Sequence, residues 1–304
     1  MEGAEVTVAG IDEPKTLIEL LKKERPDLAF NLCESLRGDP RYEIPVPVIL
    51  DSFGVAYTGN TPFALRQCLD KATAKRTLRE AGVPVPPGDV VRSEADLARL
   101  EGPIPAMVKP SREDGSIGIE SSSVCRDRAA LKRRARYVLE KMKQPAIVEA
   151  FVDGREFNVS VIGDERPRVL PLAEIDFGGL PPDVPKIVSY RAKWNTRTAE
   201  YKGTTPKFGL EDETLARKLR LTALAAFRAL GLRDYARVDT RIDAGGNPYV
   251  IDVNPNCDIA PDAGLPKAAA RAGLDYTQLI HTIAGFALER ARRNPSRLAL
   301  GTNG

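Results

Sequence analysis

Residues 235–256 read YARVDTRIDAGGNPYVIDVNPN, in which two runs of alternating side chains flank a Gly-Gly pair. This pattern predicts a β-hairpin whose two-residue loop is the glycine pair. In that register Asp239 lies opposite Asp252, and Arg237 lies opposite Asn254. Side chains alternate between the two faces of a strand, so all four are expected on one face. The other side chains are expected to form an apolar core face: Val238, Thr240 and Ile242 opposite Tyr249, Ile251 and Val253.

The polar face of this hairpin predicts a metal and anion site. Two opposed carboxylates repel each other unless a positive charge lies between them. Asp239, Asp252 and Asn254 offer hard oxygen ligands, which suit Mg²⁺. Arg237 adds a fixed fork of donors for an anion or a developing oxyanion. The alternative is a surface hairpin whose charges are solvated.

The segment before residue 83 alternates strand and helix patterns. Strands are expected at 5–10, 28–33 and 55–57, with helices at 17–23 and 46–53. This order predicts a small parallel sheet with helices on its faces. A helix is expected to open at Thr61-Pro62 and to continue through 70–81. The other predicted elements are strands at 106–109, 146–152, 157–162 and 168–175, a loop at 177–190, and helices at 126–143, 211–230 and 276–292.

Two further segments suggest a nucleotide. Lys109 ends a strand and precedes a loop in which Gly115, Ser116 and Gly118 let backbone N–H groups approach phosphate. The loop lacks the Walker pattern, so a P-loop enzyme is not supported, and an ordinary polar loop is the alternative. Glu149 on its strand could accept a hydrogen bond from an adenine amino group. An edge-strand carboxylate is the alternative there.

Composition narrows the class of protein. The chain has 304 residues, 42% hydrophobic residues and a formal net charge of +3, so neither nucleic acid nor a membrane is indicated as a partner. The start of the chain lacks a signal pattern, which predicts a cytoplasmic protein. The single histidine, His281, is expected to be structural. Four scattered cysteines argue against a disulfide framework, and Cys257 is expected to pack rather than react.

The motifs follow one order along the chain: Asp70-Lys71, Val108-Lys109-Pro110-Ser111-Arg112-Glu113, Glu149 with Gly154-Arg155-Glu156, Ala192-Lys193-Trp194, Arg237-x-Asp239 and Asp252-x-Asn254-Pro255. This ordered set resembles ATP-grasp ligases, most closely the D-alanine–D-alanine ligase family. The resemblance implies an α/β fold with three parts: an N-terminal βαβ domain at 1–70, a central ATP-grasp subdomain at 71–152 and a C-terminal catalytic subdomain at 153–304. It places ATP between the central and C-terminal sheets.

The resemblance also implies roles for individual residues. Lys71 and Lys109 match phosphate-contacting lysines, and Lys193 matches the lysine of the loop that closes over the γ-phosphate. The remaining matches are Glu149 and the backbone of Val152 at adenine, Glu156 at the ribose, and Asp239, Asp252 and Asn254 as metal ligands. The family usually has Glu where Asp252 stands. Arg237, Lys193 and Ser116 are the expected catalytic residues. The cofactors are ATP and two Mg²⁺ ions, with Mn²⁺ as an alternative.

The implied activity is ATP-dependent ligation of a carboxylate to an amine through an acyl phosphate. The expected substrates are small and amino-acid-like, and the family often forms homodimers. The chain as given starts after the family's glycine-rich loop, so either the native start lies upstream or that contact is absent. Glu34 is expected to hold a substrate ammonium instead. By equal spacing, Asp258 replaces the family's oxyanion-site glycine and Ala263 its substrate serine, which favours ligation in general over D-alanine in particular.

Two other functions stay open on the sequence alone. An ATP-grasp enzyme that phosphorylates a hydroxyl would share the nucleotide residues and differ at the acceptor. A non-catalytic nucleotide-binding protein would share the fold, but it would not need Arg237 beside the metal ligands.

Overall fold

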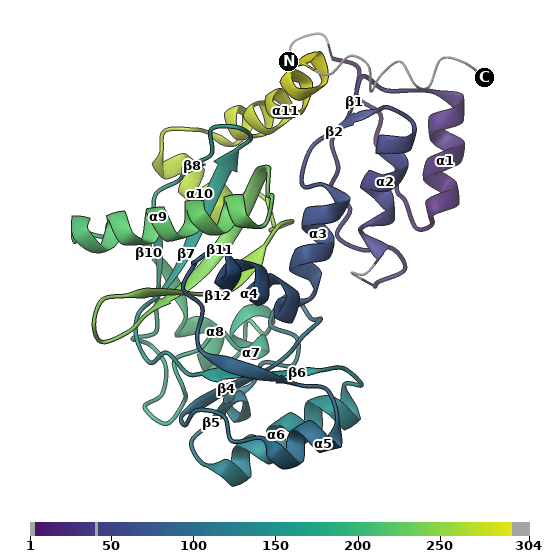
Figure 1. Ribbon diagram of the computed structural model, residues 1–304. Coiled ribbons are helices and arrows are strands. Elements are labelled where there is room, and N and C mark those ends of the chain that lie inside the picture. Colours follow the sequence, from purple (N-terminus) through teal and green to yellow (C-terminus); the bar gives the residue numbers. More distant parts are fainter. Residues whose placement is uncertain (1–3, 40–41, 294–304) are drawn as a thin grey trace.

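The computed structural model describes residues 4–39 and 42–293 (Figure 1). Its N-terminal unit contains α1 (Pro14–Lys23), α2 (Pro45–Ser52) and a parallel pair formed by β1 (Leu28–Ala29) and β2 (Ala56–Tyr57). The small parallel sheet is therefore confirmed, with shorter strands than expected. The strand predicted at 5–10 is wrong. That segment has no regular structure, and Val6 and Val8 are 79% and 93% exposed.

The helical region after Thr61 consists of two helices rather than one, α3 (Pro62–Leu69) and α4 (Lys71–Glu80). The backbone is extended at Asp70, and its carboxylate accepts hydrogen bonds from the N–H groups of Ala72 and Thr73. Asp70 is thus the N-cap of α4. The break places Lys71 at the first position of a new helix.

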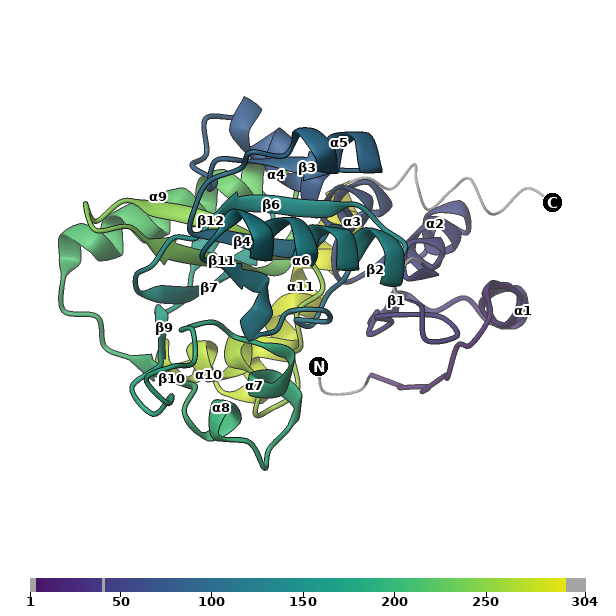
Figure 2. The same ribbon diagram turned by 90° about the horizontal axis from the view of Figure 1, so that it is seen from below.

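A four-stranded antiparallel sheet has the order β3 (Gly88–Val91), β6 (Ala146–Ala150), β4 (Ala106–Pro110) and β5 (Val124–Cys125). Helices α5 (Glu94–Arg99) and α6 (Arg128–Lys141) pack on one face, and Figure 2 shows α6 lying across it. The buried side chains on that face include Ala106, Val108, Ala146 and Val148. Because side chains alternate, Met107, Lys109, Ile147 and Glu149 point to the opposite face. A 3₁₀ turn at Ser121–Ser123 precedes β5.

A six-stranded sheet has the order β10 (Thr205–Phe208), β9 (Ala173–Asp176), β7 (Glu156–Gly163), β11 (Asp234–Ile242) and β12 (Pro248–Asn254), and β8 (Arg168–Val169) also pairs with β7. Helix α9 (Glu213–Ala229) packs on its apolar face, together with Ala74 and Leu78 of α4. The domain boundaries at 70/71 and 152/153 stay a prediction. The remaining helices are α7 (Tyr190–Trp194), α8 (Ala199–Lys202), α10 (Gly264–Arg271) and α11 (Tyr276–Arg293).

The hairpin of β11 and β12 has the predicted register at its open end but not the predicted loop. Asp239 pairs with Asp252, and Arg237 pairs with Asn254. At the closed end Ile242 pairs with Pro248, so five residues form the loop instead of two.

A β-bulge explains how the open-end register survives the wrong loop. Thr240 pairs with Val250 while Asp239 pairs with Asp252, which leaves Ile251 as the extra residue. The bulge shifts the register back by one and cancels the error at the loop. It also corrects the predicted core face, because Val250, rather than Tyr249 and Ile251, joins the apolar core.

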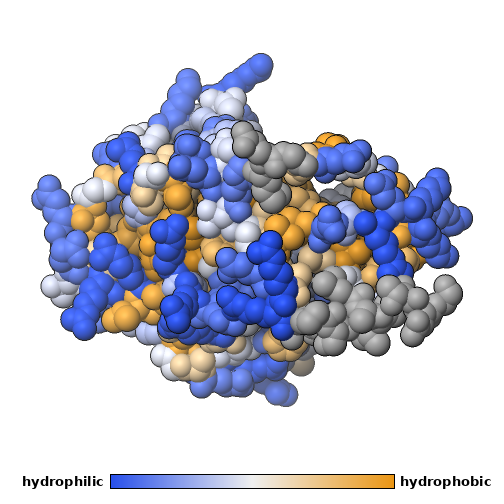
Figure 3. Space-filling model, turned by 90° about the horizontal axis from the view of Figure 1, so that it is seen from above, coloured by the Kyte–Doolittle hydropathy of each residue, from blue (hydrophilic) through white to orange (hydrophobic). Residues whose placement is uncertain are grey.

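Among the helices of the described ranges, none is both long enough and apolar enough to cross a bilayer. The face in Figure 3 mixes hydrophilic and hydrophobic residues. Exposed apolar side chains such as Leu221 on α9 and Tyr276 on α11 belong to separate helices.

Candidate active site

A cavity of about 400 Å³ is lined by residues of both sheets. From the four-stranded sheet it takes Met107, Lys109 and Glu149, the side chains turned away from α6. From β7 and β11 it takes every second residue, which is the face opposite the apolar core. The lining also includes both carboxylates, the arginine and the asparagine predicted to share one face of the hairpin, and these are Arg237, Asp239, Asp252 and Asn254.

Arg237 and Asp239 form a bidentate ion pair on β11. Arg237 Nε lies 2.7 Å from Asp239 Oδ1, and Nη2 lies 2.9 Å from Oδ2. Asn158 Nδ2 on β7 donates to Asp239 Oδ1 at 2.8 Å. Burial lowers the pKa of Arg237, but Asp239 more than offsets this and leaves it raised. The guanidinium is therefore a permanent positive charge with a fixed direction.

Asp252 on β12 is bound by a lysine from α4. Lys71 Nζ lies 2.7 Å from each carboxylate oxygen of Asp252 and 3.6 Å from Asp114 Oδ1. Burial raises the pKa of Asp252, but Lys71 and Lys109 outweigh it and the net shift is downward. Asp252 is therefore a carboxylate that is already paired with the ammonium of Lys71.

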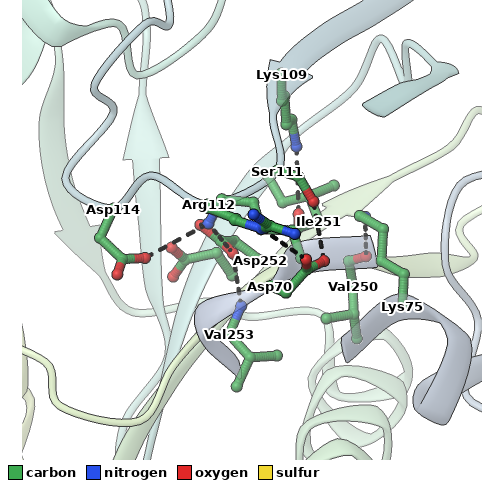
Figure 4. Close-up of polar contacts among 12 residues, drawn as sticks. Asp70, Lys75, Lys109, Ser111, Arg112, Asp114, Val250, Ile251, Asp252 and Val253 are labelled. Atoms are coloured by element: carbon green, nitrogen blue, oxygen red, sulfur yellow. Dashed lines mark hydrogen bonds and ion pairs between the residues drawn. The ribbon is translucent and has the colours of Figure 1, made fainter. Parts of the chain in front are cut away.

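Glu149 on β6 is shared by two lysines. Lys75 Nζ and Lys109 Nζ each lie 2.7 Å from one of its oxygens. The side chain of Lys109 also donates to the backbone carbonyl of Ile251 at 3.2 Å, and that of Lys75 contacts the carbonyl of Val250 at 3.5 Å (Figure 4). Lys75 is not among the site residues expected from the sequence. Its position one helical turn after Lys71 is the signal that could have found it.

Asp70 connects α4 to the glycine-bearing loop. Ser111 Oγ donates to Asp70 Oδ1 at 2.9 Å, and Arg112 Nε donates to Oδ2 at 3.2 Å. The backbone N–H of Lys71 donates to the carbonyl of Ser111 at 2.8 Å. These bonds hold the start of α4 against the end of β4, as Figure 4 shows for the side chains. They fix Lys71 and Lys109 relative to each other.

Glu156 on β7 lines the cavity beside Arg241. The two side chains are 3.7 Å apart, and Arg241 also donates to the carbonyl of Gly154 at 2.9 Å. Burial raises the pKa of Glu156 to about 7, and Arg241 only partly opposes this. Val152 lines the same cavity.

Two segments that contribute to the lining of the cavity, residues 113–119 and 187–194, are joined by hydrogen bonds, and we call them together the cover. Ser116 Oγ donates to the carbonyl of Val188 at 2.9 Å, and Trp194 Nε1 donates to the carbonyl of Gly115 at 2.8 Å. Lys193 lines the cavity from this cover, and burial lowers its pKa, as does the nearby Arg237. Gly115 and Ser116 both have positive φ, so the loop turns sharply where it meets Trp194.

Glu34 and Asp258, two of the expected acceptor residues, are not among the residues that line the cavity. Partial burial raises the pKa of Glu34, Asp258 raises it further, and Lys193 lowers it, so these three charges are close enough to interact. Ala263 lines the cavity. Asp258 Oδ1 accepts from the N–H of Ala260 at 2.8 Å. Cys257 is buried, and burial raises its pKa to about 12, which agrees with the prediction that it packs.

The metal-ligand candidates are two carboxylates and one amide. Within residues 4–39 and 42–293, no three His, Cys, Asp or Glu side chains gather as a metal cage. Asp239, Asp252 and Asn254 share one face at adjacent register positions. Such a set leaves coordination positions for phosphate and water, which is how Mg²⁺ is usually held beside a nucleotide. The donor set therefore fits Mg²⁺.

The family model described as "D-ala D-ala ligase C-terminus" matches residues 78–284, more than half of the chain. A D-alanine–D-alanine ligase of Marinomonas sp. is 34% identical over 88% of this chain and 80% of its own length. An uncharacterized protein of Sinorhizobium fredii, y4sG, is 33% identical over 86% of this chain and 75% of its own length.

A solved structure shows the same fold. The D-alanine–D-alanine ligase of Bacillus anthracis superposes with a TM-score of 0.75 at 25% sequence identity. The match covers 95% of this chain and 88% of that one.

Proposed function

The chain belongs to the D-alanine–D-alanine ligase family of ATP-grasp, ATP-dependent ligases, and on that premise we propose that it joins a carboxylate to an amine in a Mg²⁺-dependent reaction through an acyl phosphate. The observation that carries the proposal is the pairing on one hairpin face. Asp239 is held by Arg237 and Asp252 is held by Lys71, inside a cavity between two sheets. A site that only bound nucleotide would not need Arg237 at the reacting end.

The nucleotide would lie between the two sheets. Lys71 and Lys109 would contact its phosphates, while Glu149 and the backbone of Val152 would read the adenine edge. Glu156 would hold the ribose hydroxyls. All five residues line the cavity, which supports this assignment. Asp239, Asp252 and Asn254 would hold Mg²⁺, which supplies positive charge to the phosphates when bound.

The chain's own residues then account for the reaction. A substrate carboxylate oxygen attacks the γ-phosphorus, the bond to the β-phosphate oxygen breaks, and ADP leaves. An amine nitrogen next attacks the acyl carbon, the amine proton is lost, and inorganic phosphate leaves. Lys193 and Ser116, both in the cover, would hold the transferring phosphate, and Arg237 would steady the negative charge of the tetrahedral intermediate. Positioning dominates the first step, so no catalytic histidine is required.

The charges of the expected acceptor residues favour a substrate that carries a positive amino group. Glu34 and Asp258 lie within electrostatic reach of each other and of Lys193. They would attract an ammonium and repel a second carboxylate. This charge pattern supports small amino-acid-like substrates, without singling out D-alanine. A cytoplasmic location, where ATP is available, and a homodimer that sedimentation would detect are part of the same proposal.

Phosphate release from Mg·ATP tests this function directly. Single amino acids, D and L, are added first and pairs next, with mass detection of products. The proposal expects release that requires an acid and an amine, together with an adduct that has lost one water. A phosphorylated hydroxyl product would replace ligation with a kinase activity. ATP binding without turnover on any amino acid would contradict a catalytic function of this site.

A further inference from the structure

Glu149 is surrounded by more positive charge than is needed to neutralise its carboxylate. Its side chain is 2% exposed, and two ammonium groups lie 2.7 Å from it. One ion pair would balance one carboxylate, so the second lysine calls for an explanation. The two lysines come from different elements, Lys75 from α4 and Lys109 from β4.

The bulge in β12 turns two consecutive carbonyl groups toward these lysines. The carbonyl of Ile251 accepts from Lys109, and the carbonyl of Val250 lies 3.5 Å from Lys75 Nζ. In a regular strand, consecutive carbonyls point in opposite directions. The bulge at Ile251 breaks that alternation. In Figure 4 the two lysines approach β12 from different sides.

The two lysines differ in which cavity they line. Lys109 and Glu149 both line the main cavity, whereas Lys75 lines a second cavity of about 320 Å³ that shares Glu149 with the first. Lys109 can therefore turn to a phosphate in the main cavity and leave Glu149. Lys75 lies behind Glu149 and is 7% exposed, so it stays with the carboxylate when ligand binds.

We propose that Lys75 is a positioning residue that keeps Glu149 ionised while nucleotide is bound, and that this ion pair makes the site select adenine over guanine. The inference rests on the proposed placement of adenine at Glu149. Adenine presents an amino donor where guanine presents a carbonyl acceptor. An ionised carboxylate accepts from the first and repels the second. A protonated carboxyl can donate to the second and loses the distinction.

The charges around Glu149 agree with this role. Burial raises the pKa of Glu149, but Lys109 and Lys75 outweigh it and the net shift is downward. From the second cavity Arg79, Asp89 and Arg92 also face this region. Asp252 acts on Lys75 from β12, while α5 and α6 pack on the opposite face of the sheet. Once Lys109 turns to phosphate, Lys75 is the close cation left on Glu149.

The test measures binding alone, without amino acid substrates. Dissociation constants of Mg·ATP and Mg·GTP are determined by calorimetry from about pH 6 to about pH 9 for the wild type, Lys75→Met and Lys75→Arg. We expect the wild-type preference for ATP to be constant with pH. In Lys75→Met it falls by about tenfold near pH 6 and recovers as Glu149 ionises at high pH. Lys75→Arg retains the preference, since the cation is kept.

Matched variants separate the outcomes. Arg76→Met removes an exposed cation from the same helix and leaves the preference unchanged. Glu149→Gln shows the low preference at every pH. If Glu149→Gln lowers the preference but Lys75→Met weakens both nucleotides equally at every pH, the role of Lys75 is overturned.

One result would count against the proposed placement of adenine rather than against the role of Lys75. If Glu149→Gln leaves the preference unchanged, the placement of adenine is wrong. Thermal melts identify any variant that does not fold, and Lys75→Gln then replaces Lys75→Met with the same expected loss of preference.

Discussion

Lys71 binds both carboxylate oxygens of Asp252 at 2.7 Å across 181 residues of chain. The pair joins the first turn of α4 to β12, so it links a lysine proposed to contact phosphate to the hairpin face proposed to hold Mg²⁺. The ammonium lies on the carboxylate that Mg²⁺ would use in the proposed function. Binding of Mg·ATP would therefore redirect Lys71 from Asp252 toward phosphate. Lys71 and the metal are expected to compete for this carboxylate.

Asp252→Asn removes a charged oxygen ligand from the proposed metal site, so Mg²⁺-dependent turnover should fall by about 100-fold or more. The melting temperature should stay within a few degrees of wild type, because Asp114 lies 3.6 Å from Lys71 and keeps the ammonium paired. Steady-state kinetics over a Mg²⁺ titration check the result. Asp183→Asn, on an exposed loop, is the control. Normal activity of Asp252→Asn would show that Asp252 does not bind the metal.

Arg237 should affect turnover far more than nucleotide affinity. The proposed role of its guanidinium is to steady charge that develops during the reaction, and loss of one such donor costs about 100- to 1,000-fold in kcat. We expect that loss in Arg237→Ala, with the Kd of Mg·ATP changed by only about threefold. Arg237→Lys keeps the charge but not the bidentate fork to Asp239 and should recover only part of the rate. Equal losses in rate and affinity would make Arg237 a nucleotide ligand instead.

The carboxyl group of Glu156 should make the free energy of unfolding depend on pH. Its pKa is about 7 in the folded protein, against an ordinary value of 4.5. Between these values the folded state binds more protons than the unfolded state, so the free energy of unfolding falls as pH rises. The melting temperature of the ligand-free protein should therefore drop between about pH 5 and about pH 8. Glu156→Gln cannot ionise and should flatten this slope.

Glu43 contributes to the same pH range and must be separated from Glu156. Burial raises the pKa of Glu43 to about 7 as well, although Asn256 donates to it at 3.1 Å. Glu43→Gln should remove its own share of the slope, and the double variant should lose both shares. Glu101→Gln, at an exposed position, should leave the slope intact. An unchanged slope in Glu156→Gln would show that its carboxylate is already ionised when folded.

The sequence predicts features that depend on local periodicity. The alternation around Asp239 and Asp252 was enough to bring four polar side chains to one face, and the same period separates Lys109 and Glu149 from the α6 core. The hairpin loop was wrong, because a bulge depends on packing against neighbouring strands rather than on the two residues at the turn. Short elements such as β3, α5, α8 and β10 were missed since they carry too few residues for a period to be visible.

Contacts between distant segments could not be read from the sequence. The ion pair of Lys75 with Glu149 depends on how α4 lies against the four-stranded sheet, and no spacing within α4 encodes that. Asp70 was visible as part of a motif, but its bonds to Ser111 and Arg112 require β4 to end beside α4. The sequence therefore predicts which side chains share a face, while the partner of each charge depends on the tertiary arrangement.

Trp194 makes the cover over the cavity directly observable. It is the only tryptophan of the chain, its side chain is 58% exposed, and its Nε1 donates to the carbonyl of Gly115 at 2.8 Å. If Mg·ATP draws the two segments of the cover closer together, quenching of the intrinsic fluorescence by acrylamide should decrease when nucleotide is added. Stopped-flow mixing would give the rate of that closure.

A glycine substitution tests whether the contact at Trp194 holds the cover shut. In Gly115→Ala the new Cβ would meet the Trp194 ring at 3.4 Å on a backbone with φ of +61°, a conformation that costs an L-residue about 1–2 kcal/mol. We expect stronger acrylamide quenching without ligand, a higher KM for ATP and a small loss of thermal stability. Gly209→Ala is the matched control, because it has φ of +102° and nothing within 4 Å of its Cβ. It should lose stability without a change in quenching. The same quenching change in both variants would mean that backbone strain, and not the contact with Trp194, controls the cover.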